Sequence, residues 1–310
     1  MILSATAALL AASSLLGTID VPADFPAVQA AVDAAQAGDV ILIDGGTYAE
    51  AVTIDKAVTL VGRAGPLSTI SAGVAQAGPA IRLQGPASGV VTLCNLTIAV
   101  QGDHAHSAIE GGGFSELRVM HCDIPAPQVA EPAVDVAAPI TLIVDSTVVG
   151  GAGAPGIATS HDLLAYDCHL TGAPAVDVGG AFHRNGTTLV GGQEASEWIH
   201  GLGLTNLSGP LVEGERVVLE YFIENPGANG FFIVGPPAPS VDLGPFQGRA
   251  YFDLQSFTVL PVPGVPPALL NLEFQVPAVA ASLAGSTVVL QRFDGQFGLM
   301  RPTFASFIPK

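Results

Sequence analysis

The sequence predicts an all-β protein in which a β-solenoid is followed by an antiparallel β-sandwich, and three observations lead to this prediction. A short strand motif recurs five times between residues 79 and 190. The chain holds 37 glycines and 24 prolines, which separate the short strands by tight turns. After residue 205 the repeat has stopped, and longer strands with alternating polar and apolar residues follow. Repeats of this size built from strands and turns are typical of solenoids, whose coils pack only on their neighbours.

A second series of short strands lies between the copies of the first and carries Asn, Asp or His at one fixed position. The steps between these positions are 26, 24, 22 and 18 residues, so the coils shorten along the chain. Asn and Asp tolerate the left-handed backbone of a tight turn, and we therefore predict a column of turn residues. Its expected members are Asn95, His121, Asp145, Asp167 and Asn185.

Residues 1–16 are small and apolar and too short to span a bilayer, which is typical of a secretory signal peptide. They lack the Lys or Arg that usually opens such a peptide, and the alternative is an apolar first segment of the solenoid. No other segment is long and apolar enough to cross a membrane. We expect a secreted or cell-surface protein with no transmembrane segment once the signal peptide is removed.

Residues 24–38 predict a helix. Asp24 is placed to cap its first turn, Pro26 lies where a missing N–H costs little, and Gly38 is placed to end it. An apolar face runs along this segment at helical spacing. Short strands separated by turns are expected next, at residues 40–43, 51–54 and 57–61.

The segment from Val21 to Gly62 resembles the N-terminus of right-handed parallel β-helix proteins of the pectin-lyase-like superfamily. The motifs that carry the resemblance are Asp24-Phe-Pro-Ala-Val-Gln-Ala-Ala-Val-Asp-Ala-Ala, Ala37-Gly-Asp-Val-Ile-Leu-Ile-Asp-Gly-Gly-Thr-Tyr and Val52-Thr-Ile-Asp-Lys-Ala-Val-Thr-Leu-Val-Gly. The resemblance covers residues 20–195 and implies a right-handed parallel β-helix whose N-terminal helix caps the open end of the solenoid. The superfamily holds lyases, hydrolases, esterases and proteins without known activity, so it implies a fold but no single function.

The β-helix is expected at residues 17–195, a linker at 196–204 and the antiparallel β-sandwich at 205–310. Polar and apolar residues alternate from Leu270 to Val276, which is the pattern of a strand with one buried and one solvent-exposed face. The end of the chain resembles a C-terminal domain of exported bacterial surface proteins in Phe274-Gln-Val-Pro, Leu283-Ala-Gly and Val289-Leu-Gln. We expect the β-sandwich to serve as an adhesion, attachment or lectin-like module.

The formal charge of −17 is unevenly spread along the chain. Residues 1–200 carry 19 acidic residues against 5 Lys and Arg, whereas residues 201–310 carry 8 against 5. Such a surface repels nucleic acid and anionic membranes. It also repels an acidic polysaccharide unless divalent cations bridge the two.

Three cysteines do not form a disulfide framework. Cys122 and Cys168 fall at the same repeat position two coils apart, which is roughly 9–10 Å at the usual strand spacing and too far for a bond. We expect both in the core, and Cys94, beside a turn, is expected to be free.

The outward side of the first strand column is the candidate site. Glu110 and Asp135 are expected on adjacent coils, where the backbones of neighbouring strands are about 4.8 Å apart. Two carboxylates this close are suited to binding Ca²⁺ with main-chain oxygens and water, or to sharing acid and base work in glycoside cleavage. The plain alternative is a polar strand face that contacts only solvent. The column reads Arg82, Glu110, Asp135, Ala158 and Asp177, and the catalytic candidates are Glu110, Asp135 and Asp177.

Three features argue against catalysis. No Arg or Lys is expected beside these acids as the base of a β-eliminating lyase, because Arg118 and Arg184 fall on other strands. The linkers that would wall the groove shorten to four residues, which predicts a shallow groove. Ala158 interrupts the row of acids.

Enzyme motifs of the superfamily have only partial counterparts. Gly172-Ala-Pro-Ala-Val-Asp-Val-Gly-Gly faintly resembles the segment that carries the aspartate nucleophile of pectin methylesterases, which would fall on Asp177. The second aspartate motif and the arginine motif of those enzymes are missing. The Gly-His-Gly motif of polygalacturonase-like hydrolases is missing too, with Ser160-His161-Asp162 as the nearest candidate.

His104 and His106 lie in the longest linker between coils, beside Glu110. An extended His-x-His pair projects both rings to one side, a common arrangement for Zn²⁺. The alternative is two solvated loop histidines. The metal-ligand candidates are thus Glu110, Asp135, His104 and His106, and Ca²⁺ is the only cofactor expected.

Together these patterns favour an exported, non-catalytic β-helix protein that binds carbohydrate or cations or serves as a structural or adhesion element. The expected partner is a polysaccharide or a cell-surface glycan, and nucleic acid is not expected. The alternative is a polysaccharide-active enzyme, either pectate-lyase-like, a glycosidase or pectinesterase-like. It would use Glu110, Asp135 and Asp177, with His106 or His161 nearby.

Overall fold

A computed structural model describes residues 17–192 except 64–67, 74–77, 87, 103–104 and 186, and beyond these mainly the strands between 197 and 308. The chain divides into two compact units, one running from Gly17 to Ile199 and one that includes His200–Lys310. The predicted signal peptide, residues 1–16, and most of the predicted linker lie outside the described residues. Among those described, no helix reaches the length and apolarity needed to cross a bilayer.

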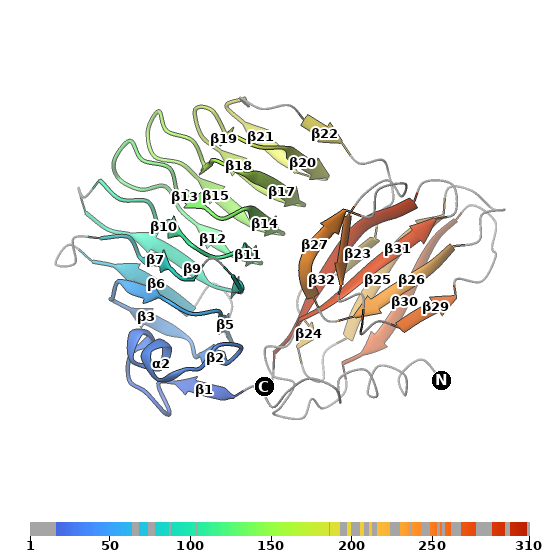
Figure 1. Ribbon diagram of the computed structural model, residues 1–310, viewed down its shortest axis with the longest axis horizontal. Helices are drawn as coiled ribbons and strands as arrows, with labels where there is room; N and C mark the ends of the chain where they lie inside the picture. The colour runs from blue at the N-terminus through green and yellow to red at the C-terminus, as the bar shows by residue number, and fades with distance from the viewer. Residues whose placement is uncertain are drawn as a thin grey trace. The chain divides into compact units, whose positions relative to one another are not determined.

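The first unit consists of three parallel sheets, and successive strands of the chain join them in turn (Figure 1). This is the arrangement of a parallel β-helix, and it confirms the predicted all-β solenoid. The nine-stranded sheet holds, in order, β1 (Thr18–Val21), β2 (Val40–Ile43), β5 (Thr59–Gly62), β8 (Val90–Cys94), β11 (Glu116–Met120), β14 (Ile140–Val144), β17 (Asp162–Tyr166), β20 (Phe182–Asn185) and β22 (Glu197–Ile199). The seven-stranded sheet holds β3 (Gly46–Tyr48), β6 (Ser68–Ala72), β9 (Thr97–Val100), β12 (Asp123–Ile124), β15 (Thr147–Val149), β18 (His169–Thr171) and β21 (Thr188–Val190). The six-stranded sheet holds β4 (Val52–Ile54), β7 (Ile81–Gln84), β10 (Ile109–Gly112), β13 (Val134–Ala137), β16 (Ile157–Thr159) and β19 (Val176–Val178).

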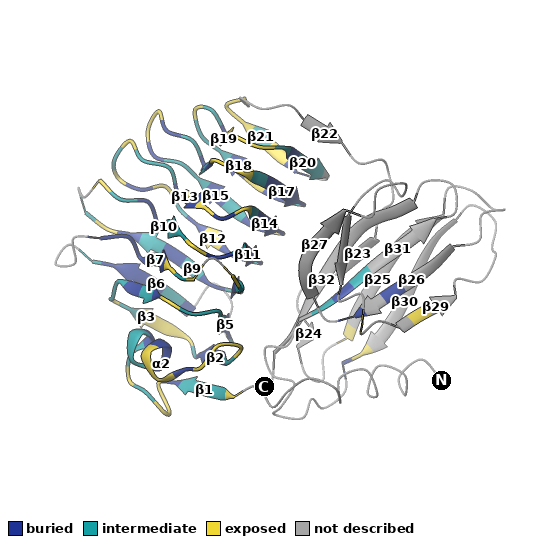
Figure 2. Cartoon of the chain, viewed as in Figure 1, coloured by how far each residue is buried: buried dark blue, intermediate teal, exposed yellow. Residues whose placement is uncertain are grey.

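The core lies inside the coils, where alternate side chains of each strand meet. Because side chains of a strand point alternately to its two faces, every second residue enters this core. In the six-stranded sheet the inward residues are buried, and Figure 2 shows buried segments recurring along successive strands. These inward residues include Ile81, Ile109, Val134, Ile157 and Val176.

The predicted turn column is present in four coils. Positive backbone φ angles occur at Asn95 (58°), His121 (53°), Asp145 (43°) and Asp167 (55°). The predicted fifth member is wrong. Asn185 ends β20 opposite Tyr166, one position before the column, because pairing with β17 extends the strand to this residue.

The helix is shorter than predicted and is capped differently. Helix α2 spans Val28–Ala34, and its N-cap residue is Ala27, which has no side-chain acceptor. The carboxylate of Glu50 instead accepts hydrogen bonds from the backbone N–H groups of Val28 (2.8 Å) and Gln29 (2.9 Å). The predicted cap at Asp24 is therefore wrong, because its carboxylate accepts the backbone N–H of Asp20. The helix still buries its apolar face in the core, through Val28, Ala31 and Val32.

Strand β22 lies within the predicted linker but pairs in parallel with β20, so it continues the nine-stranded sheet. In the second unit the described strands form three sheets whose pairs are antiparallel, except for one parallel pair at the edge of the five-stranded sheet. They comprise β23 (Thr205–Leu207), β25 (Arg216–Ile223) and β30 (Ala268–Gln275); β24 (Leu211–Val212), β32 (Gly298–Ile308), β31 (Thr287–Asp294), β26 (Gly230–Gly235) and β29 (Thr258–Pro261); and β27 (Pro237–Asp242) with β28 (Arg249–Phe252).

Candidate functional site

The six-stranded sheet aligns the predicted column residue by residue. Glu110 on β10 lies opposite Arg82 on β7 and opposite Asp135 on β13. Ala158 on β16 lies between Asp135 and Asp177 of β19. At the usual strand spacing the backbones at Asp135 and Asp177 are therefore about 9–10 Å apart, with one alanine between them.

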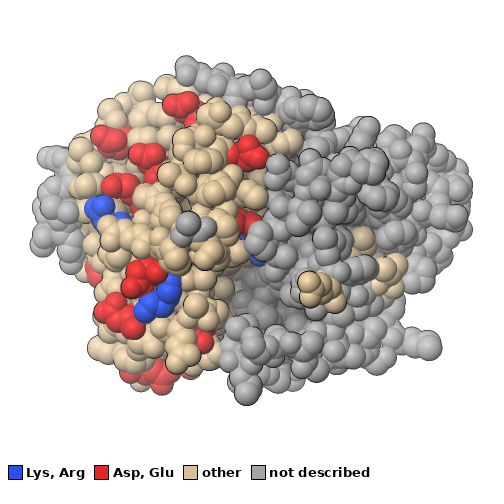
Figure 3. Space-filling view, in the orientation of Figure 1, with Lys and Arg blue, Asp and Glu red and all other residues tan. Residues whose placement is uncertain are grey.

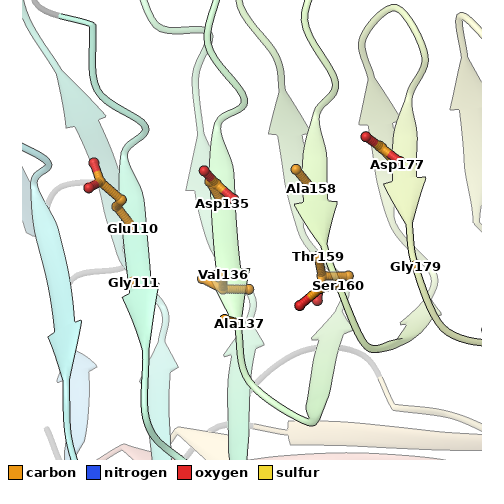
Figure 4. Close-up of a pocket in the computed structure, with 10 residues that line it drawn as sticks. All are labelled: Glu110, Gly111, Asp135, Val136, Ala137, Ala158, Thr159, Ser160, Asp177 and Gly179. Carbon is orange, nitrogen blue, oxygen red and sulfur yellow. The ribbon is translucent and has the colours of Figure 1, made fainter.

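These strands line an open groove of about 510 Å³. In Figure 4 the carboxylates of Glu110, Asp135 and Asp177 project from the same side of their strands, and only the methyl group of Ala158 interrupts the row. Small residues between the acids leave the groove open. Its lining consists of Glu110, Gly111, Asp135, Val136, Ala137, Ala158, Thr159, Ser160, Asp177 and Gly179.

Local sequence forces the acids outward. Val134 and Val176 are 0% exposed in the core, so the residue that follows each of them must point to the opposite face of the sheet. Gly111 completes this part of the groove with a φ of 112°, and a Cβ there would lie 2.2 Å from the carbonyl oxygen of Leu83. Only glycine fits this close approach of two strands.

The carboxylate of Glu110 contacts two side chains, the guanidinium of Arg82 and the imidazole of His106. Its Oε1 lies 3.4 Å from Nη1 of Arg82, and its Oε2 lies 3.0 Å from Nδ1 of His106. The prediction that no Arg or Lys stands beside these acids is wrong, because the register places Arg82 directly opposite Glu110. Arg82 and His106 thus hold the carboxylate of Glu110 at one end of the row.

Asp135 is electrostatically strained. Asp135 is an exposed residue of β13, where partial desolvation raises the pKa of its carboxyl above the ordinary value and the charges of Glu110 and Glu131 raise it further. The groove therefore disfavours a full negative charge at this position. A ligand that donates hydrogen bonds to this carboxylate would favour the charged form again.

The surface of the first unit is broadly acidic. In the view of Figure 3, Asp and Glu side chains spread over its visible face, and few Lys or Arg side chains lie among them. Within the described residues no group of three or more His, Cys, Asp or Glu side chains converges as a metal site. Of the predicted ligands, His106 meets Glu110, Asp135 lies on the adjacent strand, and His104 lies outside the described residues.

A Ser–His pair at the groove was not singled out from the sequence as a pair. The hydroxyl of Ser160 lies 2.8 Å from Nδ1 of His161, and both residues are exposed. The backbone N–H of His161 donates to Oγ1 of Thr159 at 3.3 Å. The available signal was the position of Ser160 two residues after Ala158, and Ser160 lines the same groove as the acids.

Arg118 and Arg184 lie away from the groove, as predicted. Arg118 is on β11, where its Nε donates to Oε1 of Glu116 at 2.6 Å and both side chains are buried. Arg184 is on β20 and donates to the carbonyl oxygen of Thr187 at 2.8 Å. Neither residue belongs to the six-stranded sheet.

All three cysteines are free and buried, which confirms the prediction for this chain. The backbone N–H of Cys122 donates to Oγ of Ser146, one coil along in the same column. Burial raises the pKa of the Cys122 thiol far above its usual range and that of Cys168 to about 12. Neither thiol is therefore poised as a nucleophile.

The chain matches no protein-family model, no curated protein and no solved structure. The resemblance to the pectin-lyase-like superfamily consequently depends on the sequence motifs alone.

Proposed function

We propose that this is an exported protein of the right-handed parallel β-helix type that binds a polysaccharide or cell-surface glycan in its acidic groove without cleaving the chain. The observation that carries this proposal is the row of three carboxylates projecting into one open groove. Carboxylates accept short, charge-assisted hydrogen bonds from donors such as sugar hydroxyls. The gap over Ala158 leaves room for a ring between Asp135 and Asp177.

The open form of the groove favours binding of a chain over its hydrolysis. Small residues and short coil linkers leave the ligand in contact with water along its length. Catalytic sites usually enclose the reacting bond and exclude water from it. In addition, Arg82 and His106 already engage the carboxylate of Glu110.

We propose that the second unit attaches the protein to a surface. Its antiparallel strands suit a β-sandwich, the architecture of many adhesion and lectin-like modules. Together with the apolar residues 1–16, which suit a signal peptide, this favours a secreted or cell-surface location.

A panel of neutral polysaccharides tests the binding proposal. Asp135→Asn and Asp177→Asn should each weaken binding by about tenfold or more, since a hydrogen bond to a charged group contributes about 1.5–3 kcal/mol. Asp123→Asn removes one charge from an exposed position on the seven-stranded sheet and should bind like the wild type. Binding that is unaffected by both groove variants would rule out the groove as the site.

A second candidate function is cleavage of a polysaccharide by a lyase, glycosidase or pectinesterase-like reaction. The observation that favours it is the raised pKa of Asp135, the direction that a general acid requires. It predicts that the wild type releases reducing ends, unsaturated sugars or methanol, and that Glu110→Ala or Asp135→Ala abolishes the release. A wild type that cuts nothing in a broad panel removes this candidate.

A further inference from the structure

We propose that Ser160 and His161 form a nucleophile and general base at one end of the groove and remove an ester substituent from the bound carbohydrate. The inference rests on the proposed function, because the groove must first hold the glycan. It concerns only the substituent and leaves the glycosidic bonds of the chain intact.

The hydrogen bond between the two side chains supports these roles. Ser160 Oγ lies 2.8 Å from Nδ1 of His161, within the reach that proton transfer from a nucleophile to a base requires. For this reaction His161 must be neutral, with Nδ1 accepting the hydroxyl proton and the ring proton on Nε2. The hydrogen bond from the His161 backbone to Thr159 helps to hold the base in place.

The position of Ser160 fits a substituent of a sugar bound over Ala158. Ser160 directly follows the end of β16, about 6–7 Å along the chain from Ala158, and lines the same groove. A ring held between Asp135 and Asp177 would therefore extend a substituent toward the hydroxyl of Ser160.

The neighbouring coils leave Ser160 open to a ligand. Ala137 and Gly179, which line the groove beside it, are among the smallest residues of the lining. The next coil also runs close under the dipeptide, since a Cβ at Gly179 would lie 2.8 Å from the carbonyl oxygen of Ser160. A Cβ at Gly180 would lie 2.6 Å from the carbonyl carbon of His161. The close approach supports the backbone of the pair and leaves its side chains exposed.

The reaction balances without a metal or a cofactor. Ser160 Oγ bonds to the ester carbonyl carbon while its proton passes to Nδ1 of His161. The bond from that carbon to the sugar oxygen then breaks, and the proton passes from His161 to the sugar oxygen, which gives an acylated Ser160 and a free sugar hydroxyl. Water attacks the acyl group by the same route, and the acid and Ser160 are released.

Two probes test the inference on the full chain: p-nitrophenyl acetate and an O-acetylated neutral polysaccharide that the groove binds. The wild type should release acetate from both, and mass spectrometry of a quenched reaction should find one acetyl group on Ser160. Ser160→Ala and His161→Ala should each slow the release by about 100-fold or more, the usual contribution of a nucleophile's base. His169→Ala, an exposed histidine on β18, controls for hydrolysis by surface imidazoles and should react like the wild type.

Three outcomes are distinguishable. Acetylation at Ser160 that is lost in both variants supports the inference. A wild type that binds the acetylated polysaccharide but neither releases acetate nor acylates Ser160 overturns the inference and leaves the binding function intact. Failure to bind any polysaccharide overturns both.

Discussion

At the residue scale, Asp135 shows how burial and neighbouring charges combine in the groove. Because its pKa is raised in the folded chain, its protonated form is favoured by folding. The resulting stabilisation is fully present below the ordinary pKa of about 3.9 and is lost as the pH rises through the raised pKa. At pH 7 the charged carboxylate therefore destabilises the fold.

Asp135→Asn should accordingly raise the free energy of unfolding at pH 7, by less than about 1 kcal/mol for a like-charge contact across strands. The gain should disappear below about pH 4, where the aspartate is protonated in both states. Thermal melts of the wild type and the variant at both pH values measure this, with Asp123→Asn as the control for lost net charge. A lower melting temperature of Asp135→Asn at pH 7 would contradict the electrostatic account.

The buried thiols give a second prediction at this scale. Cys94, Cys122 and Cys168 are buried, and the raised pKa of Cys122 and Cys168 leaves almost no thiolate in the folded chain at pH 8. Iodoacetamide should label none of the three in the native protein and all three in guanidinium chloride. Rapid labelling of the native protein, followed by mass spectrometry, would show that the core is more open than described.

At the element scale, the turn column explains how each coil passes from one sheet to the next. Asp167 has a φ of 55°, a conformation that costs a β-branched residue about 1–2 kcal/mol. Asp167→Val should therefore lower the free energy of unfolding by about that amount, whereas Asp167→Asn should be nearly neutral. Chemical denaturation of the two variants makes the comparison. Equal stability of both would mean that the turn accepts other backbone conformations.

The elements also show what the sequence could and could not predict. The column of Asn and Asp was predictable because a left-handed turn restricts residue type locally. The cap of α2 was not, because it comes from Glu50, which lies 22 residues further along the chain. Likewise the column of Arg82 and the acids was predictable from the repeat, but the contacts of the Glu110 carboxylate with Arg82 and His106 depend on side-chain conformation. The Ser160–His161 contact depends on side-chain conformation, which no spacing specifies.

At the scale of the whole molecule, charge should decide which polysaccharides bind. Most of the 27 acidic residues fall in the first 200 residues, so an anionic glycan is repelled unless divalent cations bridge it. Polygalacturonate should therefore bind only with millimolar Ca²⁺ and should be released by a chelator, whereas a neutral glycan should bind in both conditions. Binding of polygalacturonate in the presence of a chelator would contradict this prediction.

Binding of Ca²⁺ to the folded chain can also be tested without a polysaccharide. If the acids of Glu110 and Asp135 hold Ca²⁺ in the folded chain alone, millimolar Ca²⁺ should raise the melting temperature. The shift should be smaller in Asp135→Asn and unchanged in Asp123→Asn. An unchanged melting curve of the wild type would remove Ca²⁺ as a ligand of this site.

The most direct test of the central claim fills the groove without changing its charge. Ala158→Phe places a ring between Asp135 and Asp177, at an outward position where the core is not disturbed. Calorimetric titration with a neutral polysaccharide that binds the wild type should show no binding to this variant, at an unchanged melting temperature. Thr147→Phe, on the seven-stranded sheet, should bind normally. Wild-type affinity in Ala158→Phe would contradict the claim that carbohydrate occupies this groove.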